Sequence, residues 1–301
     1  MKFRTEKLIL EGPDLTGKTS LYQSIHKATN FHWNIQDRSA LSMVCYARQY
    51  GRDATDLRRD LYKELTNLNN RLVILMPPVE VILQRFHQRG DDVQNEKSLK
   101  ELYDIFADEV EKICRLPNVC LIRSVLSQEE ITESVLSWLK SIESCTSETV
   151  GKHVRMFVEC AAGDEHVLQL ETSGEIQDKY DTSIMSNPLE EHYYKKIERD
   201  FCNIIEKEFD GINDYNVPQG FDSRRFYYSS NSCMSSLHLK PRGDVLEFIC
   251  AFRSTDAQKN AGIDFQFLEY LVHKMANEYF LDCSMYRIML TMNSAHLRHD
   301  I

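Results

Sequence analysis

Apolar runs alternate with helix-compatible stretches through the first half of the chain. We predict strands at the apolar runs, which span residues 7–10, 31–35, 71–76 and 118–123. Helices are expected between and after them, at residues 18–28, 40–50, 54–69, 79–88, 99–116 and 127–142. The run at 71–76 is continuous and stops at Pro77 and Pro78, which is typical of a strand buried on both faces. Strands that alternate with helices predict an α/β domain with a parallel sheet.

The second half of the chain follows a different pattern. Residues 143–152 are small and polar without periodicity, and beyond them apolar and polar positions alternate at 153–160 and 166–171, which predicts two strands. Further strands are expected at 225–229, 235–240, 245–252 and 288–292, and helices at 189–209 and 265–279. This mixture predicts an α+β domain. We therefore expect two domains, at residues 1–145 and 152–301.

The composition of the chain restricts its possible binding partners more than it restricts the possible folds. The 301 residues are 42% hydrophobic, enough for two ordinary cores, and carry a formal net charge of −10. That charge disfavours duplex nucleic acid as a partner, because it repels a phosphate backbone. The nine cysteines form no C-x-x-C motif, the N-terminus shows no signal-peptide pattern, and no apolar run reaches the roughly 20 residues needed to cross a bilayer. We expect a soluble, cytoplasmic protein with free thiols and no membrane partner.

The strongest motif lies at residues 12–19, G-P-D-L-T-G-K-T, between the first predicted strand and the first predicted helix. Glycines at both ends let backbone N–H groups turn toward phosphates at the positive end of the helix. Lys18 is expected to bind the β and γ phosphates of ATP, and the Thr19 hydroxyl to bind Mg²⁺. A chance match in a surface turn is the alternative. The predicted phosphate-binding residues of this loop are Gly12, Asp14, Gly17, Lys18, Thr19 and Ser20.

The wider pattern E-G-x-D-x-x-G-K-T, at residues 11–19, resembles the phosphate loop of thymidylate kinases and related deoxynucleoside kinases. In those families a strand ends in an acidic residue and an arginine, followed by a hydroxyl residue, and Asp37-Arg38-Ser39 matches this pattern. The resemblance implies that Arg38 holds substrate phosphate or assists catalysis, with Lys18 and Asp37 as the other catalytic residues. The carboxyl end of a strand is also where α/β sheets place ligand groups. A surface ion pair is the alternative.

Residues 78–95 resemble the lid helix of the same kinases, whose arginines close over the phosphates of ATP. Arg85 and Arg89 are four residues apart and share a helix face, although a solvated face would show the same spacing. One departure concerns the acceptor. Asp37 follows Thr19 by only 18 residues, so the substrate-binding helices usual between them are largely missing. Whether the acceptor is a nucleoside or a monophosphate stays open.

A second resemblance covers roughly residues 185–300. Cys233 precedes Arg253-Ser254-Thr255-Asp256 by 20 residues, and Asn293-Ser294-Ala295-His296 lies near the end of the sequence. This combination resembles thymidylate synthase and the related pyrimidine hydroxymethylases, although a cysteine before a strand is by itself usually a small core residue. The resemblance implies that Cys233 attacks C6 of a pyrimidine. It also implies a set of nucleotide-binding residues, namely Arg224, Arg225, Arg253, Ser254, Asp256, Asp264 and His296.

The chemistry of these residues is coherent. Arginine forks suit a phosphate dianion, and the same cations favour the thiolate form of a cysteine. Asp264 stands where thymidylate synthases have an asparagine; an ionised aspartate only accepts hydrogen bonds and so suits the amino group of cytosine. The resemblance therefore favours a dCMP-type hydroxymethylase over a dUMP methylase. It further implies methylenetetrahydrofolate as a cofactor and a homodimer through this domain, in which Arg224 and Arg225 complete the partner's site.

Some departures from that family are visible. We can place no counterpart of its proton-relay glutamate, His238 stands at the position of its glutamine after the cysteine, and Arg298 at that of its second sugar-binding tyrosine. The sequence also stops at Ile301, without the tail that closes over folate in the family. These departures make a nucleotide-binding pocket a safer prediction than folate chemistry.

The leading hypothesis is a bifunctional enzyme that acts on small-molecule nucleotides. An ATP-dependent (deoxy)pyrimidine nucleoside monophosphate kinase would be fused to a pyrimidine C5-modifying domain, a pairing that would suit a virus or phage. The alternatives are a nucleoside kinase, a kinase fused to a catalytically silent nucleotide-binding or dimerisation module, and a slowly hydrolysing nucleotide switch.

Overall fold

The computed structural model describes residues 7–89, 94–141, 147–161, 166–186, 191–209 and 226–297. The chain divides into two compact units, one within Glu6–Ser144 and the other within Cys145–Ile301. We call them the N-terminal and the C-terminal unit.

The N-terminal unit is built on a four-stranded parallel sheet in the order β2-β1-β3-β4. The strands are β1 (Lys7–Glu11), β2 (Asn34–Asp37), β3 (Asn70–Leu75) and β4 (Val119–Ile122). Each strand predicted in this half is present, but β2 begins three residues later than expected. Asn30 and Phe31 have φ angles of 50° and 58°, and this left-handed backbone cannot continue into a strand.

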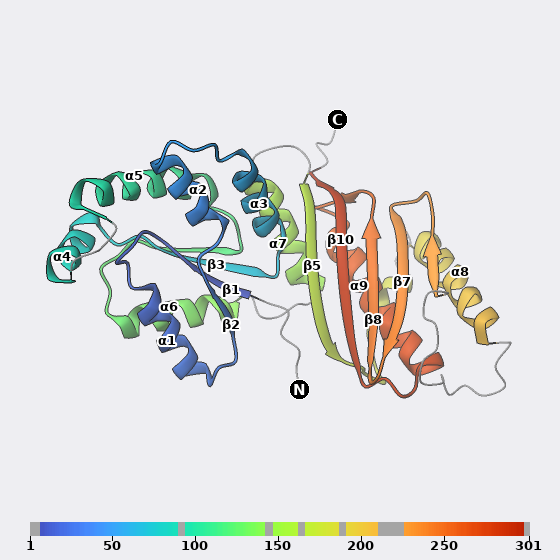
Figure 1. Ribbon diagram of the computed structural model, residues 1–301. Helices are drawn as coiled ribbons and strands as arrows, with labels where there is room; N and C mark the ends of the chain where they lie inside the picture. Colours follow the sequence, from blue (N-terminus) through green and yellow to red (C-terminus); the bar gives the residue numbers. More distant parts are fainter. Residues whose placement is uncertain are drawn as a thin grey trace. The chain divides into compact units, whose positions relative to one another are not determined.

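Helices cover both faces of this sheet, with α1 and α6 on one side and α2, α3 and α5 on the other (Figure 1). Leu8, Leu10 and Val73 of the sheet form one core cluster with Leu21 of α1 and Val135 of α6. The predicted α/β fold with a covered parallel sheet is thus confirmed for this unit. The helices are α1 (Lys18–Thr29), α2 (Ala40–Gln49), α3 (Thr55–Thr66), α4 (Val79–Arg89), α5 (Glu96–Ile113) and α6 (Gln128–Ser141).

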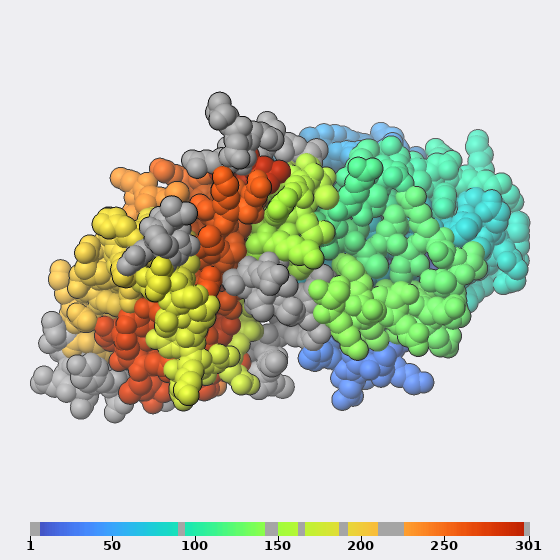
Figure 2. Space-filling model, turned by 180° about the vertical axis from the view of Figure 1, so that it is seen from behind, coloured from blue at the N-terminus to red at the C-terminus, as the bar shows by residue number. Residues whose placement is uncertain are grey.

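The C-terminal unit is built on a mixed sheet in the order β5-β10-β8-β7-β6, with β9 beside β10. The strand β10 runs parallel to β8 and β9 and antiparallel to β5. Helices α8 and α9 pack on one face of this sheet, which lies at the back in Figure 1 and toward the viewer in Figure 2. This unit is α+β, as expected. Its elements are α7 (Ser147–Cys160), β5 (His166–Glu175), a 3-10 turn (Ser183–Ser186), α8 (Glu191–Phe209), β6 (Tyr227–Ser229), β7 (Met234–Arg242), β8 (Val245–Phe252), β9 (Thr255–Asp256), α9 (Ala261–Tyr279) and β10 (Met285–His296).

One prediction for this unit is wrong. Residues 153–160, expected to be a strand, belong to helix α7, which begins within the stretch expected to be a linker. The buried positions Val150, Val154 and Phe157 follow helical spacing and form one stripe. Gly151 packs so closely on Gly262 of α9 that a Cβ at Gly151 would lie 3.1 Å from the Gly262 Cα. The packing of this stripe therefore favours a helix, although apolar and polar residues also alternate here as they would in a strand.

Candidate functional site

The loop between β1 and α1 has a backbone that requires glycine at its two ends. Gly12 has a φ of 133° and Gly17 a φ of 101°, both in the region that L side chains avoid. A Cβ at Gly12 would also lie only 2.2 Å from the carbonyl oxygen of Leu75 in the neighbouring strand. The loop is therefore a tight cradle that only glycine permits at its start.

Lys18, the first residue of α1, is folded back over this loop. Its Nζ donates to the carbonyl oxygens of Gly12 at 2.8 Å and Pro13 at 2.7 Å. Burial lowers the pKa of Lys18, and the nearby cation Arg38 lowers it further. A phosphate would be a stronger partner for this ammonium group than two neutral carbonyl oxygens. The residues present thus fit a bound triphosphate.

A cavity of about 370 Å³ opens over the loop and α1. Its walls include every predicted phosphate-site residue of this unit except Gly12: the loop and helix residues from Asp14 to Ser20, together with Asp37, Arg38, Arg85 and Arg89. Arg85 of α4 donates from Nη1 to the carbonyl oxygen of Leu15 at 2.8 Å. The fold brings these cationic side chains from three different elements to one cavity.

Arg38 follows the end of β2 and is held in a defined position. Its φ of 70° is unusual for a residue with a side chain. Its Nη2 donates to Asp14 Oδ1 at 2.8 Å, and its guanidinium lies 5.4 Å from the centre of the Tyr46 ring. The Tyr46 hydroxyl donates to Asp14 Oδ2 at 2.6 Å. Asp14, predicted as a phosphate-site residue, thus holds Arg38 against Tyr46.

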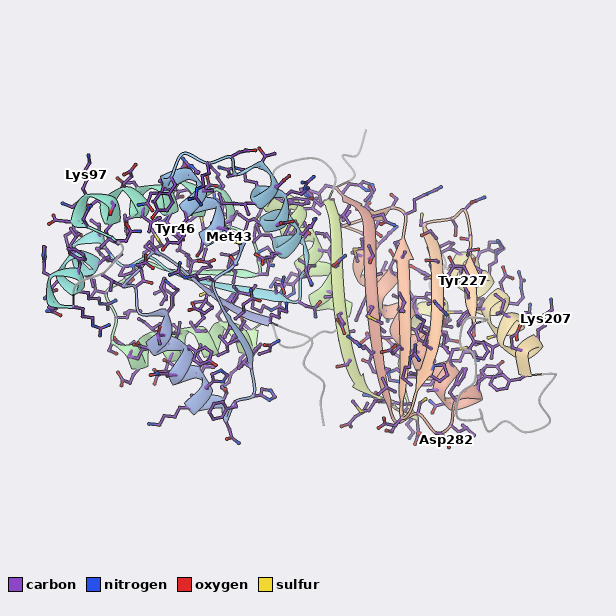
Figure 3. All side chains as sticks on the ribbon, in the orientation of Figure 1. Met43, Tyr46, Lys97, Lys207, Tyr227 and Asp282 are labelled. Carbon is purple, nitrogen blue, oxygen red and sulfur yellow. The ribbon has the colours of Figure 1, made fainter. Side chains whose placement is uncertain are left out.

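A second cavity, of about 630 Å³, lies against α2 and α3, and Arg38 lines it as well. Met43 and Tyr46 of α2 lie next to each other on the wall of this cavity (Figure 3). The sequence prediction missed this wall. Its signature was present, because Met43, Tyr46 and Tyr50 repeat at helical spacing and all keep a part of their surface exposed.

Glu11 is a further residue that the sequence prediction did not assign. It ends β1 directly before Gly12, and its side chain is fully buried. Its carboxylate accepts hydrogen bonds from the backbone N–H groups of Gly12, Ser39 and Ser42 and from the hydroxyls of Ser39 and Ser42. The phosphate loop and the start of α2 are therefore joined through one buried carboxylate. A charged residue at the end of an apolar strand was the available clue.

In the C-terminal unit, most predicted residues lie at one end of the sheet. The exposed Cys233 precedes β7, and its carbonyl oxygen accepts from the N–H of Arg253, at the end of β8, at 2.7 Å. Asp256 of β9 pairs in register with His296 of β10. Ser254 lies between Arg253 and β9. Arg224, Arg225 and Arg298 lie outside the described residues.

Asp264 and Cys233 are both near α8. Asp264 is buried in the first turn of α9, and its Oδ1 accepts from the Tyr194 hydroxyl at 2.8 Å. The neighbouring Tyr193 accepts from the N–H of Met234 at 2.7 Å and interacts electrostatically with both Asp264 and Cys233. Burial raises the pKa of Tyr193 to about 12, so this phenol stays neutral. The sequence prediction assigned neither tyrosine, and adjacent tyrosines on an amphipathic helix gave no distinct pattern.

The described residues hold no group of three or more histidine, cysteine or acidic side chains placed to bind a metal ion. No helix among them combines the length and the apolar composition that a membrane span needs.

Comparison with known proteins gives two partial structural matches of low similarity. No protein-family model matches the chain, and no curated protein matches it. The YorR protein of Bacillus subtilis, solved in complex with phosphorylated GDP, matches with 18% identity and a TM-score of 0.36 over 46% of this chain and 96% of its own. Thymidylate synthase from T4 phage matches with 19% identity and a TM-score of 0.26 over 32% of this chain and 35% of its own, about a third of its length. At these values neither match assigns a function to this chain.

Proposed function

We propose that the N-terminal unit is a phosphotransferase that moves the γ-phosphoryl group of ATP to a (deoxy)pyrimidine nucleoside monophosphate. The observation that carries this proposal is the cavity in which Lys18, Arg38 and Arg85 meet over a glycine-dependent loop. Loops of this kind present backbone N–H groups and a lysine to a polyphosphate. A nucleotide switch would need the same loop but has no use for a second cavity that shares Arg38.

The residues divide the work of such a transfer. Lys18 would exchange its two carbonyl partners for phosphate oxygens, and the Thr19 hydroxyl would hold Mg²⁺, which neutralises charge on the transferred group. Arg38 lines both cavities. In the proposed reaction the acceptor oxygen would attack phosphorus beside this guanidinium while the bond to the ADP oxygen breaks. The fixed position of Arg38 limits the motion required when charge develops on the group in transfer.

The second cavity is the proposed acceptor site. Its volume of about 630 Å³ lies within the range of about 300–1,000 Å³ that is common for small-molecule pockets. Arg38 and Arg52 both line it, and a guanidinium is suited to an acceptor phosphate. This favours a monophosphate acceptor over a nucleoside.

The test is direct. Purified protein is incubated with ATP, Mg²⁺ and each nucleoside and monophosphate, and the products are identified by mass spectrometry. We expect a diphosphate product from a pyrimidine monophosphate, and its loss in Lys18→Ala with the melting temperature retained. Products from nucleosides alone would establish the alternative acceptor, and slow ADP release without any phosphorylated acceptor would establish the switch.

For the C-terminal unit we propose a pyrimidine nucleotide C5-modifying activity of the dCMP-hydroxymethylase type, with Cys233 as nucleophile and methylenetetrahydrofolate as the carbon donor. It is supported by the placement of Cys233 beside Arg253 and of Asp256 beside His296. Attack of the thiolate at C6 would leave C5 carbanion-like, so C5 would exchange its hydrogen with water. Release of tritium from C5-labelled dCMP, lost in Cys233→Ser, tests this proposal. Nucleotide binding without exchange would instead support a catalytically silent module.

A homodimer through the C-terminal unit belongs to the same proposal, since Arg224 and Arg225 would complete the partner's phosphate site. Paired arginines are costly to bury without an anion. Sedimentation at micromolar concentration is expected to give a dimer of the 35.2 kDa chain. A monomer at all concentrations would contradict the shared site.

A further inference from the structure

Two helices with different surfaces form walls of the second cavity. Met43 and Tyr46 of α2 and its C-cap residue Tyr50 line the cavity. Tyr46 and Tyr50 follow Met43 by three and seven residues, so the three side chains share one face. From α3, Leu57, Asp60 and Glu64 line the cavity with the same spacing. One wall is therefore largely aromatic and apolar, and the other carries carboxylates.

Glu64 accepts one hydrogen bond from the part of the chain that the structure describes, and that bond uses one of its two carboxylate oxygens. Its Oε2 accepts from the backbone N–H of Ala40, the first residue of α2, at 2.9 Å. Among the described residues, no donor contacts Oε1. The side chain is half-buried, and Glu64 lines the cavity. Oε1 is thus the oxygen available to a ligand.

The two walls suit different parts of a nucleobase. Aromatic rings and methionine sulfur pack favourably on the flat face of a base. An ionised carboxylate accepts hydrogen bonds but cannot donate them. It therefore matches an exocyclic amino group, as in cytosine, and repels the carbonyl that uracil and thymine carry at the same place. Arg38 lies at the side of this cavity that adjoins the phosphate cavity. An acceptor whose phosphate binds Arg38 would therefore place its base between α2 and α3.

We propose that Glu64 selects the acceptor, so that the N-terminal unit phosphorylates nucleoside monophosphates whose base carries an amino group, with cytosine as the pyrimidine of this class. This inference rests on the phosphotransferase function proposed above. It goes beyond that function because the phosphate loop and the arginines carry no information about the base.

The experiment is a competition at limiting ATP between equimolar dCMP and dUMP, which gives the ratio of their kcat/KM values from one preparation. We expect dCMP to be preferred about tenfold or more, because an unmatched buried polar contact costs about 1–3 kcal/mol. In Glu64→Gln the Ala40 N–H keeps the amide oxygen, so the NH₂ group faces the ligand and the ratio should fall below one. The ratio is unaffected by partial unfolding, since both acceptors meet the same active molecules.

Asp56→Asn is the matched control. Asp56 is an exposed carboxylate on the same helix, paired with Arg59, and does not line the cavity. Its ratio should equal that of the wild type. CMP and UMP are run in parallel, since a hydroxyl of the sugar could also donate to Glu64.

The outcomes separate the two proposals. Equal use of dCMP and dUMP, a ratio unchanged in Glu64→Gln, or a change that follows the sugar would overturn the role of Glu64 and leave the phosphotransferase intact. If no acceptor is phosphorylated, dCMP binding is compared by calorimetry in the wild type and in Glu64→Gln, whose C-terminal units are identical. Weaker dCMP binding by the variant would then overturn only the phosphotransferase, and equal binding would overturn both.

Discussion

The Ser42 hydroxyl donates to Glu11 Oε2 at 2.6 Å, and the same oxygen accepts from the N–H of Gly12 at 3.1 Å. A residue of α2 and the first peptide of the phosphate loop therefore share one acceptor atom. Any shift of either segment changes the hydrogen bond of the other. Since α2 also lines the second cavity, this shared atom connects both cavities mechanically.

Replacing Glu11 by glutamine should break one side of this connection. If the amide oxygen takes the place of Oε1, which serves Ser39, the amide NH₂ takes the place of Oε2. It then faces both the Gly12 N–H and the Ser42 hydroxyl and cannot accept from either. Loss of a buried acceptor costs about 1–3 kcal/mol of folding stability, and the released Gly12 peptide lets the phosphate loop shift. We therefore expect a lower free energy of unfolding together with a fall in kcat of about tenfold or more. Steady-state kinetics and urea unfolding measure the two effects. Glu101→Gln, at an exposed position of α5, is the control; wild-type kinetics in Glu11→Gln would refute the connection.

Arg38→Ala should affect the acceptor and spare ATP. The guanidinium lines both cavities but is partly exposed, so its loss removes contacts to the phosphoryl group more than it removes stability. We expect a higher acceptor KM or a lower kcat with nearly unchanged ATP affinity by calorimetry. Tyr46→Phe, which removes the hydroxyl that bonds to Asp14 and interacts with Arg38, should show a milder form of the same change. An unchanged acceptor profile in Arg38→Ala would mean that the Arg38–Asp14 pair is structural only.

Asp264→Asn should change the base preference of the C-terminal unit. Its buried carboxylate accepts from Tyr194, and the asparagine can present either an oxygen or an NH₂ group to a base. We expect wild-type protein to exchange tritium from dCMP about tenfold or more faster than from dUMP, and the variant to reduce or reverse this ratio. Tyr194→Phe tests whether the phenol orients the carboxylate, because a loss of selectivity without a loss of nucleotide binding would follow. Equal rates on both nucleotides in the wild type would end the cytosine hypothesis for this unit.

Glu269 of α9 should make the C-terminal unit less stable as the pH rises. Burial raises the pKa of Glu269 to about 7 from its ordinary value of 4.5, and the negative charge of Asp181 also raises it. Between these two values the unfolded chain releases a proton that the folded chain retains, so the free energy of unfolding falls with increasing pH and levels off above about 7. Glu269→Gln has no ionisable group at this position, so its free energy of unfolding does not fall in this way. Its stability relative to the wild type should rise by about 1–2 kcal/mol from pH 5 to pH 8, after allowance for partial solvation.

Hydrogen exchange of α9 peptides, corrected for intrinsic rates, measures this difference in the full-length protein. Glu278→Gln changes an exposed carboxylate of the same helix that is paired with Lys274, and should show no such trend. A relative stability of Glu269→Gln that does not vary with pH would disprove the raised pKa.

Local sequence signals predicted the N-terminal unit well because they agree with its packing. Ser127 and Glu130 cap the start of α6 through two reciprocal hydrogen bonds, of 2.8 and 3.2 Å, and this helix was predicted at residues 127–142. The phosphate loop was predictable because its backbone favours glycine at both ends, Gly12 and Gly17. In α7, by contrast, the spacing of the valines fits both a helix and the alternation of a strand. Only the contact with α9 distinguishes these two conformations.

The parts of the site that sequence could not reveal depend on contacts between distant residues. Glu11 and Ser42 are 31 positions apart in the sequence, and no local pattern predicts that their side chains form a hydrogen bond. The orientation of the Glu64 carboxylate depends on its hydrogen bond with the Ala40 amide, which lies on another helix. Tertiary contacts of this kind define which oxygen of a carboxylate is left for a ligand.

Because Arg38 belongs to both cavities, a donor and an acceptor bound together are neighbours across one guanidinium. A single molecule that joins adenosine and a cytosine nucleoside through a chain of phosphates would then engage both cavities at once. The second half of such a molecule binds at the high effective concentration set by the first, and its affinity would exceed that of either half by a factor of about 10²–10⁴.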